Sequence, residues 1–316
     1  MNRLRKNGTT NQDTKKRLPR GAAVAFGFFD GLHLGHQRLM DRLFEIAREN
    51  RYTSMVYTFS NHPFSVLGKG HPAMLFTPEE KWHALRAYGA EHVCMVPFTK
   101  ELSRTAYDMF INNLMRSIPI REVVIGFDYR MGRNAEGTPE KLRELGGELG
   151  FTVHVVEPVM YGDLPISSTR IRECVQAGNL KDARDMLGRP YSVSGKVAQG
   201  RRLGSGLGFP TANLAFAPEK ALVPGGVYAT QTVVDGRAYA SVTNVGVCPT
   251  VNARANIGIE THLLDFEGNI YEKTVEVLFL DKLRDEQAFE SVEELCAQIG
   301  RDVKKAGKIF ASTNGC

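Results

Sequence analysis

Two histidines and three glycines lie close together near the amino end of the chain, in the segment G-F-F-D-G-L-H-L-G-H from Gly27 to His36. The segment follows a short apolar run at 22–26 and precedes an amphipathic run at 37–50, an order typical of a strand, a tight turn and a helix. A helix start offers free N–H groups and a positive dipole end to an anion, and His33 and His36 add donors for a phosphate that gains charge. We therefore interpret the segment as an ATP site with two catalytic histidines.

Other residues of the same turn are candidate nucleotide contacts. Its glycines allow a ligand to approach the backbone closely. Asp30 has two interpretations, because it is either an aspartate that forms the turn or an acid placed beside the nucleotide and its metal. The sequence leaves both open. The candidate contacts in this turn are Gly27, Phe28, Asp30, Gly31 and Gly35.

A second chemical feature is the segment I-S-S-T-R-I-R at residues 166–172. Three hydroxyl residues before a helical run suit a helix N-cap, and two arginines then stand near the start of that helix. An ordinary capped helix is the simpler interpretation. Beside the histidine segment, however, the arginines would supply the permanent positive charge that a triphosphate needs. The candidate nucleotide contacts here are Ser167, Ser168, Thr169, Arg170 and Arg172.

A third feature is the glycine-rich stretch G-R-R-L-G-S-G-L-G-F-P-T-A-N-L at residues 200–214. Such a loop could wrap phosphates through its backbone N–H groups. Thr211 and Asn213 are two apart on an extended segment, so both face the same side and offer the hard oxygens that Mg²⁺ accepts. A glycine-rich barrel corner with a turn asparagine is the alternative. The candidates are Gly204, Gly206, Gly208 and Pro210 for the nucleotide, and Thr211 and Asn213 for the metal.

A fourth feature is Glu260, in the strand-like segment I-E-T-H-L-L-D-F. Apolar residues crowd both sides of it. A carboxylate in such a strand is either a solvated charge at a strand edge or a general base that points into a pocket. Both interpretations stay open from the sequence.

The elements that must position the first two features alternate in kind. We expect strands at 22–26, 54–59, 92–96, 122–125 and 152–156, and helices at 37–50, 78–88, 105–117 and 139–149. This alternation predicts an α/β fold in which right-handed crossovers join parallel strands into an open, doubly wound sheet. Ligands bind such sheets at the carboxyl ends of the strands.

The pattern changes to all-β after residue 187. Glycine, proline and asparagine separate strand-like runs, which we place at 191–197, 226–234, 238–245, 258–264 and 274–280. One helical pattern follows at 289–305. This predicts a small antiparallel barrel closed by a carboxyl-terminal helix. The domain boundary is expected at 187–191, where L-G-R-P supplies a helix stop followed by a proline.

Length and composition set further limits. The 316 residues correspond to about two domains. We find neither an apolar run of the roughly 18 residues that a membrane span needs nor a signal core, and we expect no membrane partner. Five scattered cysteines without C-x-x-C spacing argue against a zinc knuckle or a disulfide framework. We therefore expect a cytoplasmic protein.

The formal net charge of +5 comes from the amino-terminal tail. Residues 1–20 hold seven of the 40 Lys and Arg residues but one of the 35 Asp and Glu residues, so the remainder is close to neutral. A folded domain that binds nucleic acid carries a basic surface patch. Because the charge outside the tail is close to neutral, we expect no nucleic-acid partner. The tail is either a solvated disordered extension or an arm that binds a polyanion.

These features together resemble the bacterial bifunctional riboflavin kinase and FAD synthetase family, over about residues 21–305. The family's G-x-F-D-G-x-H-x-G-H motif is matched at 27–36, its S-S-T-R-I-R motif at 167–172, and its G-F-P-T-A-N motif at 208–213. A further family segment corresponds to 126–132, where Asp128 stands in the nucleotide-contacting position. Glu260 matches the proposed base.

The resemblance implies three segments. They are a disordered basic tail at 1–20, a Rossmann-like FMN adenylyltransferase domain at 21–187, and a six-stranded antiparallel flavokinase barrel with a terminal helix at 188–316. The implied activities are phosphorylation of riboflavin to FMN and adenylylation of FMN to FAD and pyrophosphate, both with ATP and with Mg²⁺ or Mn²⁺.

The chain departs from the family pattern in its first module. Ser60 replaces a usual Asp or Asn, Met131 a common Phe and Thr138 a common Asp, so adenylylation is expected to be weaker than phosphorylation. A kinase with lost adenylylation and a non-catalytic flavin-binding regulator are the alternatives. A class I aminoacyl-tRNA synthetase also uses an H-x-G-H turn, but this chain lacks a K-M-S-K-S-like loop.

Overall fold

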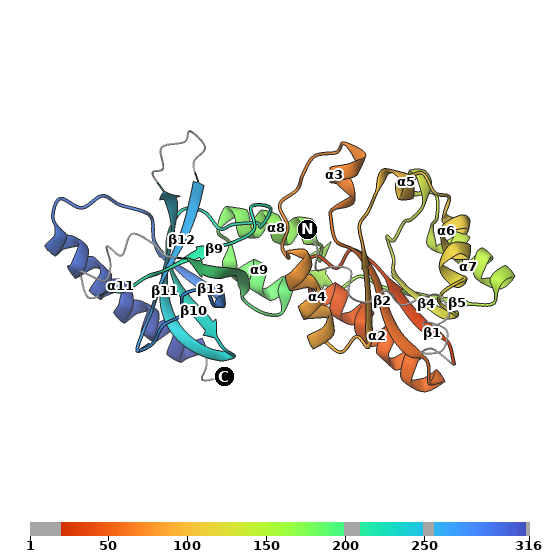
Figure 1. Ribbon diagram of the computed structural model, residues 1–316, viewed down its shortest axis with the longest axis horizontal. Helices are drawn as coiled ribbons and strands as arrows, with labels where there is room; N and C mark the ends of the chain where they lie inside the picture. Colours follow the sequence, from red (N-terminus) through yellow and green to blue (C-terminus); the bar gives the residue numbers. More distant parts are fainter. Residues whose placement is uncertain (1–19, 199–208, 249–255, 314–316) are drawn as a thin grey trace. The chain divides into compact units, whose positions relative to one another are not determined.

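The computed structural model describes residues 20–198, 209–248 and 256–313. The chain forms two compact units, Met1–Ser168 and Thr169–Cys316, and each is described by itself (Figure 1). The predicted tail at 1–20 lies almost wholly outside the described residues, as do Gly204, Gly206 and Gly208.

A five-stranded parallel sheet forms the centre of the first unit. Its strand order is β3-β2-β1-β4-β5, and each neighbouring pair is parallel. The order reverses between β1 and β4, and in open α/β sheets ligands bind at such a reversal, beyond the carboxyl ends of the strands. The strands are β1 (Ala22–Phe26), β2 (Thr53–Phe59), β3 (His92–Val96), β4 (Ile120–Gly126) and β5 (Thr152–Val156).

Helices cover both faces of this sheet (Figure 1). On one face Met40 and Leu43 pack with Leu85 against the sheet, and on the other Ile111 and Leu142 do so. The predicted doubly wound sheet is confirmed. The helices are α2 (Leu34–Asn50), α3 (Pro63–Leu67), α4 (Pro78–Ala87), α5 (Lys100–Ser103), α6 (Tyr107–Met115) and α7 (Pro139–Leu149), and a small hairpin follows, β6 (Met160–Tyr161) with β7 (Leu164–Pro165).

The second unit is a closed barrel preceded by two helices. The strand order around the barrel is β10-β11-β12-β9-β8-β13, with antiparallel neighbours, so the predicted six-stranded antiparallel barrel is confirmed. The elements are α8 (Ser168–Ala177), α9 (Leu180–Leu187), β8 (Tyr191–Ala198), β9 (Ala212–Ala215), β10 (Gly226–Val234), β11 (Arg237–Cys248), β12 (Asn256–Leu263), β13 (Thr274–Arg284) and α11 (Val292–Thr313).

The interior of the barrel contains a hydroxyl cluster. Side chains alternate between the two sides of a strand, and the inward positions of three neighbouring strands hold hydroxyl groups that are at most 1% exposed. They satisfy one another through hydrogen bonds of 2.7 to 3.4 Å. The cluster consists of Thr230, Thr232, Ser241, Thr243 and Thr261.

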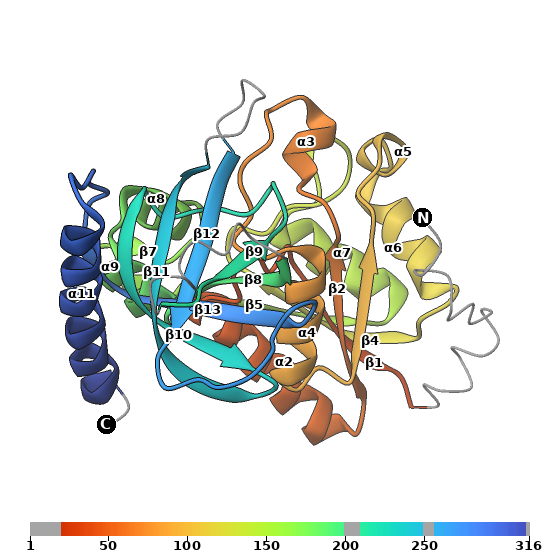
Figure 2. The ribbon, with the colours of Figure 1, turned by 60° about the vertical axis from the view of Figure 1, so that its left-hand side comes forward.

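The terminal helix packs on the outside of the barrel (Figure 2). Ala306 of α11 meets Val227 and Ala229 of β10, the outward neighbours of the hydroxyl positions. Asp302 of α11 accepts a hydrogen bond of 2.9 Å from the guanidinium of Arg284. The helix contacts β10, β11 and β13.

Candidate functional sites

The turn after β1 is tightly constrained. Phe29 and Leu32 adopt positive φ angles of 53° and 40°, which non-glycine residues seldom do, and Gly31 has a φ of 77°. A Cβ on Gly27 would lie 2.9 Å from the ring of Phe29, which is fully buried. Such backbone strain costs on the order of 1 to 3 kcal/mol per residue and is concentrated at functional sites.

Asp30 binds a distant segment of the first unit. Its carboxylate is 1% exposed and accepts backbone hydrogen bonds from Leu75, at 3.1 Å, and Phe76, at 2.8 Å. Both carboxylate oxygens therefore accept hydrogen bonds from within the protein, and these bonds attach the segment before α4 to the turn. Neither open interpretation anticipated this anchor. A nucleotide contact at Asp30 stays a prediction.

The two histidines form a stacked pair at the start of α2. Their ring centroids are 3.6 Å apart, with an angle of 21° between the planes. His33 is the N-cap residue, and its Nδ1 accepts a hydrogen bond of 3.3 Å from the backbone N–H of His36. Because Nδ1 accepts, the proton of a neutral His33 is on Nε2.

His36 carries a polar atom that lacks a partner. Its Nδ1 is buried without a hydrogen bond in the described part of the chain. Burial lowers the pKa of His36 well below its ordinary value, and the neighbouring His33 and Lys81 lower it further. Buried polar groups are nearly always satisfied. An uncharged imidazole with an unmet nitrogen, beside a helix start, therefore fits a place where a ligand binds.

Lys81 is a site residue that the sequence analysis missed. Its side chain is fully buried, and Nζ donates a hydrogen bond of 2.9 Å to the carbonyl of Phe59 while lying 3.6 Å from the ring centroid of Phe28. Burial lowers its pKa to about 7, against the opposing effect of Asp30. One sequence signal could have found it, because Lys81 lies four residues before the apolar Leu85 and so shares the buried face of α4.

Other predicted contacts meet at the same edge of the sheet. Phe28 lies against the ring of His62, at 4.8 Å, and its carbonyl accepts a hydrogen bond of 3.0 Å from Thr58. Asp128 is exposed and follows β4, the parallel neighbour of β1. The Ser168 hydroxyl donates a hydrogen bond of 2.9 Å to the backbone carbonyl of Asp30. Phe28 and Ser168 thus contact or belong to the turn, whereas Asp128 is placed at the same edge of the sheet by the pairing of β4 with β1.

The remaining residues of the S-S-T-R-I-R segment lie just before helix α8 or in its first turn. Ser167 is half-buried and Thr169 is exposed. Arg170 is half-buried, whereas Arg172 is 9% exposed. Contacts of these residues with a nucleotide stay predictions.

The three departures from the family pattern are ordered parts of the first unit. The backbone N–H of Ser60 donates a hydrogen bond to the carbonyl of Val96. Met131 pairs with Gly137 in an isolated bridge, and Thr138 caps α7. Their effect on adenylylation stays a prediction.

Backbone register brings Asn213 and Glu260 together in the barrel. The two residues are direct partners between β9 and β12, as are Ala212 and Thr261. Partners across an antiparallel pair point to the same side. Since Thr261 faces the interior, Asn213 and Glu260 both lie on the outer wall, where Glu260 is half-buried. Because β12 has a strand on each side, Glu260 is no edge charge.

His262 is a second residue that the sequence analysis missed. Its Nδ1 lies 2.8 Å from the carbonyl of Pro210, which can only accept, so Nδ1 donates this hydrogen bond. Its ring also meets the ring edge of Phe209 at 5.6 Å. The contact attaches β12 to the segment that leads into Thr211. One sequence signal could have identified His262: it lies two residues after Glu260, so the two side chains share a face of the strand.

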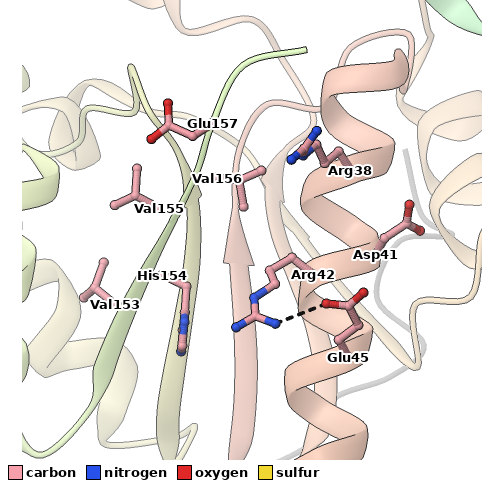
Figure 3. Close-up of a pocket in the computed structure, with 9 residues that line it drawn as sticks. All are labelled: Arg38, Asp41, Arg42, Glu45, Val153, His154, Val155, Val156 and Glu157. Carbon is pink, nitrogen blue, oxygen red and sulfur yellow. Dashed lines mark hydrogen bonds and ion pairs between the residues drawn. The ribbon is translucent and has the colours of Figure 1, made fainter.

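A separate groove of about 720 Å³ lies between α2 and the edge strand β5 (Figure 3). Its wall carries charges of both signs, including the ion pair of Arg42 with Glu45 at 3.1 Å. None of the predicted site residues lines it.

Known proteins resemble this chain over nearly its whole length. A family model described as FAD synthetase matches residues 15–170, and one described as riboflavin kinase matches residues 187–310. The two units thus define a two-domain enzyme class with an α/β nucleotidyltransferase-like part and a flavokinase barrel. A protein named bifunctional riboflavin kinase/FMN adenylyltransferase from Escherichia coli K12 is 34% identical over 93% of this chain and 94% of its own length. The protein of the same name from Bacillus subtilis 168 is 33% identical over 92% of this chain and 93% of its own length.

The chain belongs to the bifunctional riboflavin kinase/FMN adenylyltransferase family. A crystal structure of a Streptococcus pneumoniae protein named as a macrolide-efflux protein has the same fold, with a TM-score of 0.81 and 30% identity over 90% of this chain and 93% of that one. In the described ranges, we find no helix that has the length and apolar character to cross a membrane.

Proposed function

We propose that this chain makes FAD from riboflavin in two ATP-dependent steps. The barrel phosphorylates riboflavin to FMN, and the α/β unit transfers AMP from a second ATP to FMN, releasing pyrophosphate. The observation that carries the proposal is that one chain matches both the riboflavin kinase and the FAD synthetase family models. The paired Asn213 and Glu260, and the stacked His33 and His36, support the assignment of one step to each unit.

Glu260 is the proposed general base of the kinase step. A primary alcohol such as the 5′-hydroxyl of riboflavin is a weak nucleophile, and an aligned base contributes roughly 10² to 10⁴ in rate. A half-buried carboxylate on the barrel wall can receive that proton while it stays open to a substrate. The proton leaves the hydroxyl as its oxygen attacks the γ-phosphorus of ATP, and ADP departs.

Thr211 and Asn213 are the proposed ligands of Mg²⁺ or Mn²⁺. Asn213 lies directly across from Glu260, and both ligands would offer neutral hard oxygens. In the described ranges no group of three His, Cys, Asp or Glu side chains could hold a metal. This donor set fits a cation that takes its other ligands from nucleotide phosphates and water. When bound, the cation neutralises charge on the transferring phosphoryl group.

The adenylyl transfer needs no base. The phosphate of FMN has a second pKa of about 6 and is mostly a dianion at neutral pH, so it can attack the α-phosphorus of ATP directly. His33 and His36 are proposed to donate to the α-phosphate, and Arg170 and Arg172 to stabilise the leaving pyrophosphate. Incoming phosphates favour the charged imidazole, which would offset the burial that keeps His36 neutral.

The test is to incubate the purified chain with riboflavin, ATP and Mg²⁺ and to separate riboflavin, FMN and FAD over time. We expect FMN first and FAD later, and no product with excess EDTA. FMN that accumulates without FAD would identify a kinase with lost adenylylation, as the Ser60 change allows. Unchanged riboflavin, despite flavin binding, would identify a non-catalytic regulator.

Three further properties are part of this proposal. The domain boundary at 187/188 is kept, although the compact units divide at Ser168 and Thr169. A cytoplasmic location is supported by the free thiols of Cys94, Cys174 and Cys296. The substrates are small molecules, and a nucleic-acid partner is not part of the proposal.

A further inference from the structure

A buried ammonium group lies directly behind the turn that carries the histidine pair. The Lys81 side chain comes from α4, outside every motif, and is fully buried. Its Nζ contacts the Phe59 carbonyl at the end of β2 and the Phe28 ring just after β1. Lys81 therefore joins the carboxyl ends of two neighbouring parallel strands, the edge at which such a sheet binds its ligand.

Packing alone does not require a lysine at this position. Leu85 is fully buried on the same face of α4, one turn later, and an unbranched apolar side chain such as methionine fills irregular space well. A buried ammonium costs free energy because it loses its hydration. Groups whose protonation is strongly perturbed by burial occur preferentially at functional sites.

We propose that Lys81 is a positioning residue for adenylyl transfer, which holds Phe28 and the end of β2 in place and provides a positive charge behind His36. The inference rests on the proposed function of the first unit. Lys81 does not touch the reacting atoms in this proposal. It acts through the turn and through the histidine pair.

The charged and titratable groups around Lys81 come from three segments: the turn after β1, the start of α2 and the N-cap of α3. Asp30 of the turn favours its charged form, and Lys81 in turn disfavours a charged His36, which already stacks on His33. The ring of His62 contacts the ring of Phe28, which in turn contacts Lys81. Burial lowers the pKa of Lys81 to about 7, so the anionic phosphates of ATP would raise its charged fraction on binding.

Three variants of the full chain test the proposal: Lys81→Met removes the charge, Lys81→Arg keeps it, and Lys69→Met is the control. Lys69 is exposed and lies 5.7 Å from the ring centroid of Phe64, so it is also a lysine beside an aromatic ring. We expect Lys81→Met to lower kcat for FMN adenylylation about 10- to 100-fold, by analogy with the loss that follows removal of a residue that orients a metal ligand. Riboflavin phosphorylation, measured in the same sample, should be unchanged in all three.

The pH profile separates this role from a structural one. The dependence of kcat/KM for ATP reports groups of the free enzyme, so wild-type activity should fall above about pH 7 as Lys81 loses its proton. Arginine stays charged throughout this range. The kcat/KM of Lys81→Arg should therefore not decrease above pH 7, even if its overall rate is reduced. An alkaline limb that is identical in wild type and Lys81→Arg would overturn the proposal, as would normal FAD formation by Lys81→Met.

The wild-type protein supplies a measurement that needs no variant. With ¹³C-labelled lysine, one side-chain signal should titrate near pH 7; if every lysine signal is constant below pH 9, the inference is wrong even where the variants fail to fold. Failure of the proposed function gives a different result. In that case wild type itself makes no FAD from supplied FMN.

Discussion

The histidine pair and the Asn213–Glu260 pair are placed by different means. His33 and His36 stack at the start of a helix, beside a strained turn and a buried lysine. Asn213 and Glu260 lie on the outer wall of a barrel, opposite each other because two strands pair in one register. The first arrangement depends on burial and charge, and the second on hydrogen bonds between backbones.

The two sites should therefore fail in different ways. A change of charge near the first site alters the protonation of its neighbours, because low polarity strengthens electrostatic effects. A shift of one residue between β9 and β12 would turn Glu260 from the outer wall to the interior. The hydroxyl cluster lies on the inner side of that pairing, where Thr261 stands opposite Ala212.

The largest effect is expected from Glu260→Gln, which keeps the shape but cannot accept the proton. FMN formation should fall by roughly 10² to 10⁴, while conversion of supplied FMN to FAD is retained. Chromatographic assay of both steps measures this, with the exposed Glu267→Gln as the matched control. Equal loss of both activities would contradict two separate sites.

His36→Ala should produce the opposite selectivity. FAD formation from FMN should fall by about 10² to 10³, the usual loss when one group that stabilises transition-state charge is removed, and FMN formation should continue. The exposed His83→Ala is the control on α4. If FAD accumulates at the wild-type rate, the assigned role of the imidazole is wrong.

Lys81→Met should stabilise the first unit by about 1 to 3 kcal/mol at pH 7, because each pKa unit corresponds to about 1.4 kcal/mol and the lost contacts of the ammonium offset part of the gain. The pKa of Lys81 falls from 10.5 to about 7 on folding. Between these values the unfolded chain binds more protons, so wild-type stability rises with pH. The advantage of the variant is thus largest below about pH 7 and shrinks toward pH 10.

Urea unfolding of wild type and Lys81→Met at pH 7 and pH 10 measures this difference. Lys69→Met should behave as wild type at both values. A loss of stability in Lys81→Met at pH 7 would mean that the ammonium is held by contacts that outweigh its burial.

The smallest effect is expected from Thr261→Val in the barrel. Valine keeps the shape but removes the oxygen that accepts a 2.8 Å hydrogen bond from Thr243. The barrel should lose about 1 kcal/mol of stability, so riboflavin phosphorylation should be lost at a lower temperature than in wild type. The control Thr274→Val, at an exposed position, should not change that temperature. An equal effect of the two variants would show that the cluster does not stabilise the barrel.

Local patterns predicted most elements of the fold. The strands of both units and the main helices lie close to their expected positions, since apolar periodicity and turn residues act over a few neighbours. Several short elements were missed, among them α3, α5, β9 and the hairpin of β6 with β7. Helices α3 and α5 span one turn each, and β9 (Ala212–Ala215) lacks the β-branched residues that mark a strand. The terminal helix also extends to Thr313, beyond the expected 289–305.

The site was only partly predictable, and Asp30 shows why. Its partners Leu75 and Phe76 are 45 and 46 residues away, so no local pattern could reveal them. A lysine is ordinarily solvated, and the burial of Lys81 includes contacts with Phe59 at the end of β2 and with Phe28 just after β1. The interpretation of Glu260 as an edge charge was open until the strand order placed β12 inside a closed barrel.

The amino-acid sequence by itself determined the kinds of chemistry available, the order of the elements and the division into an α/β part and a β part. These depend on side-chain type and on interactions between near neighbours. Tertiary structure alone decided which polar groups are buried, which imidazole nitrogen lacks a hydrogen-bond partner among the described residues, and which residues face Glu260. Burial and strand register arise from contacts between distant parts of the chain, and the pKa values of His36 and Lys81 follow from that burial.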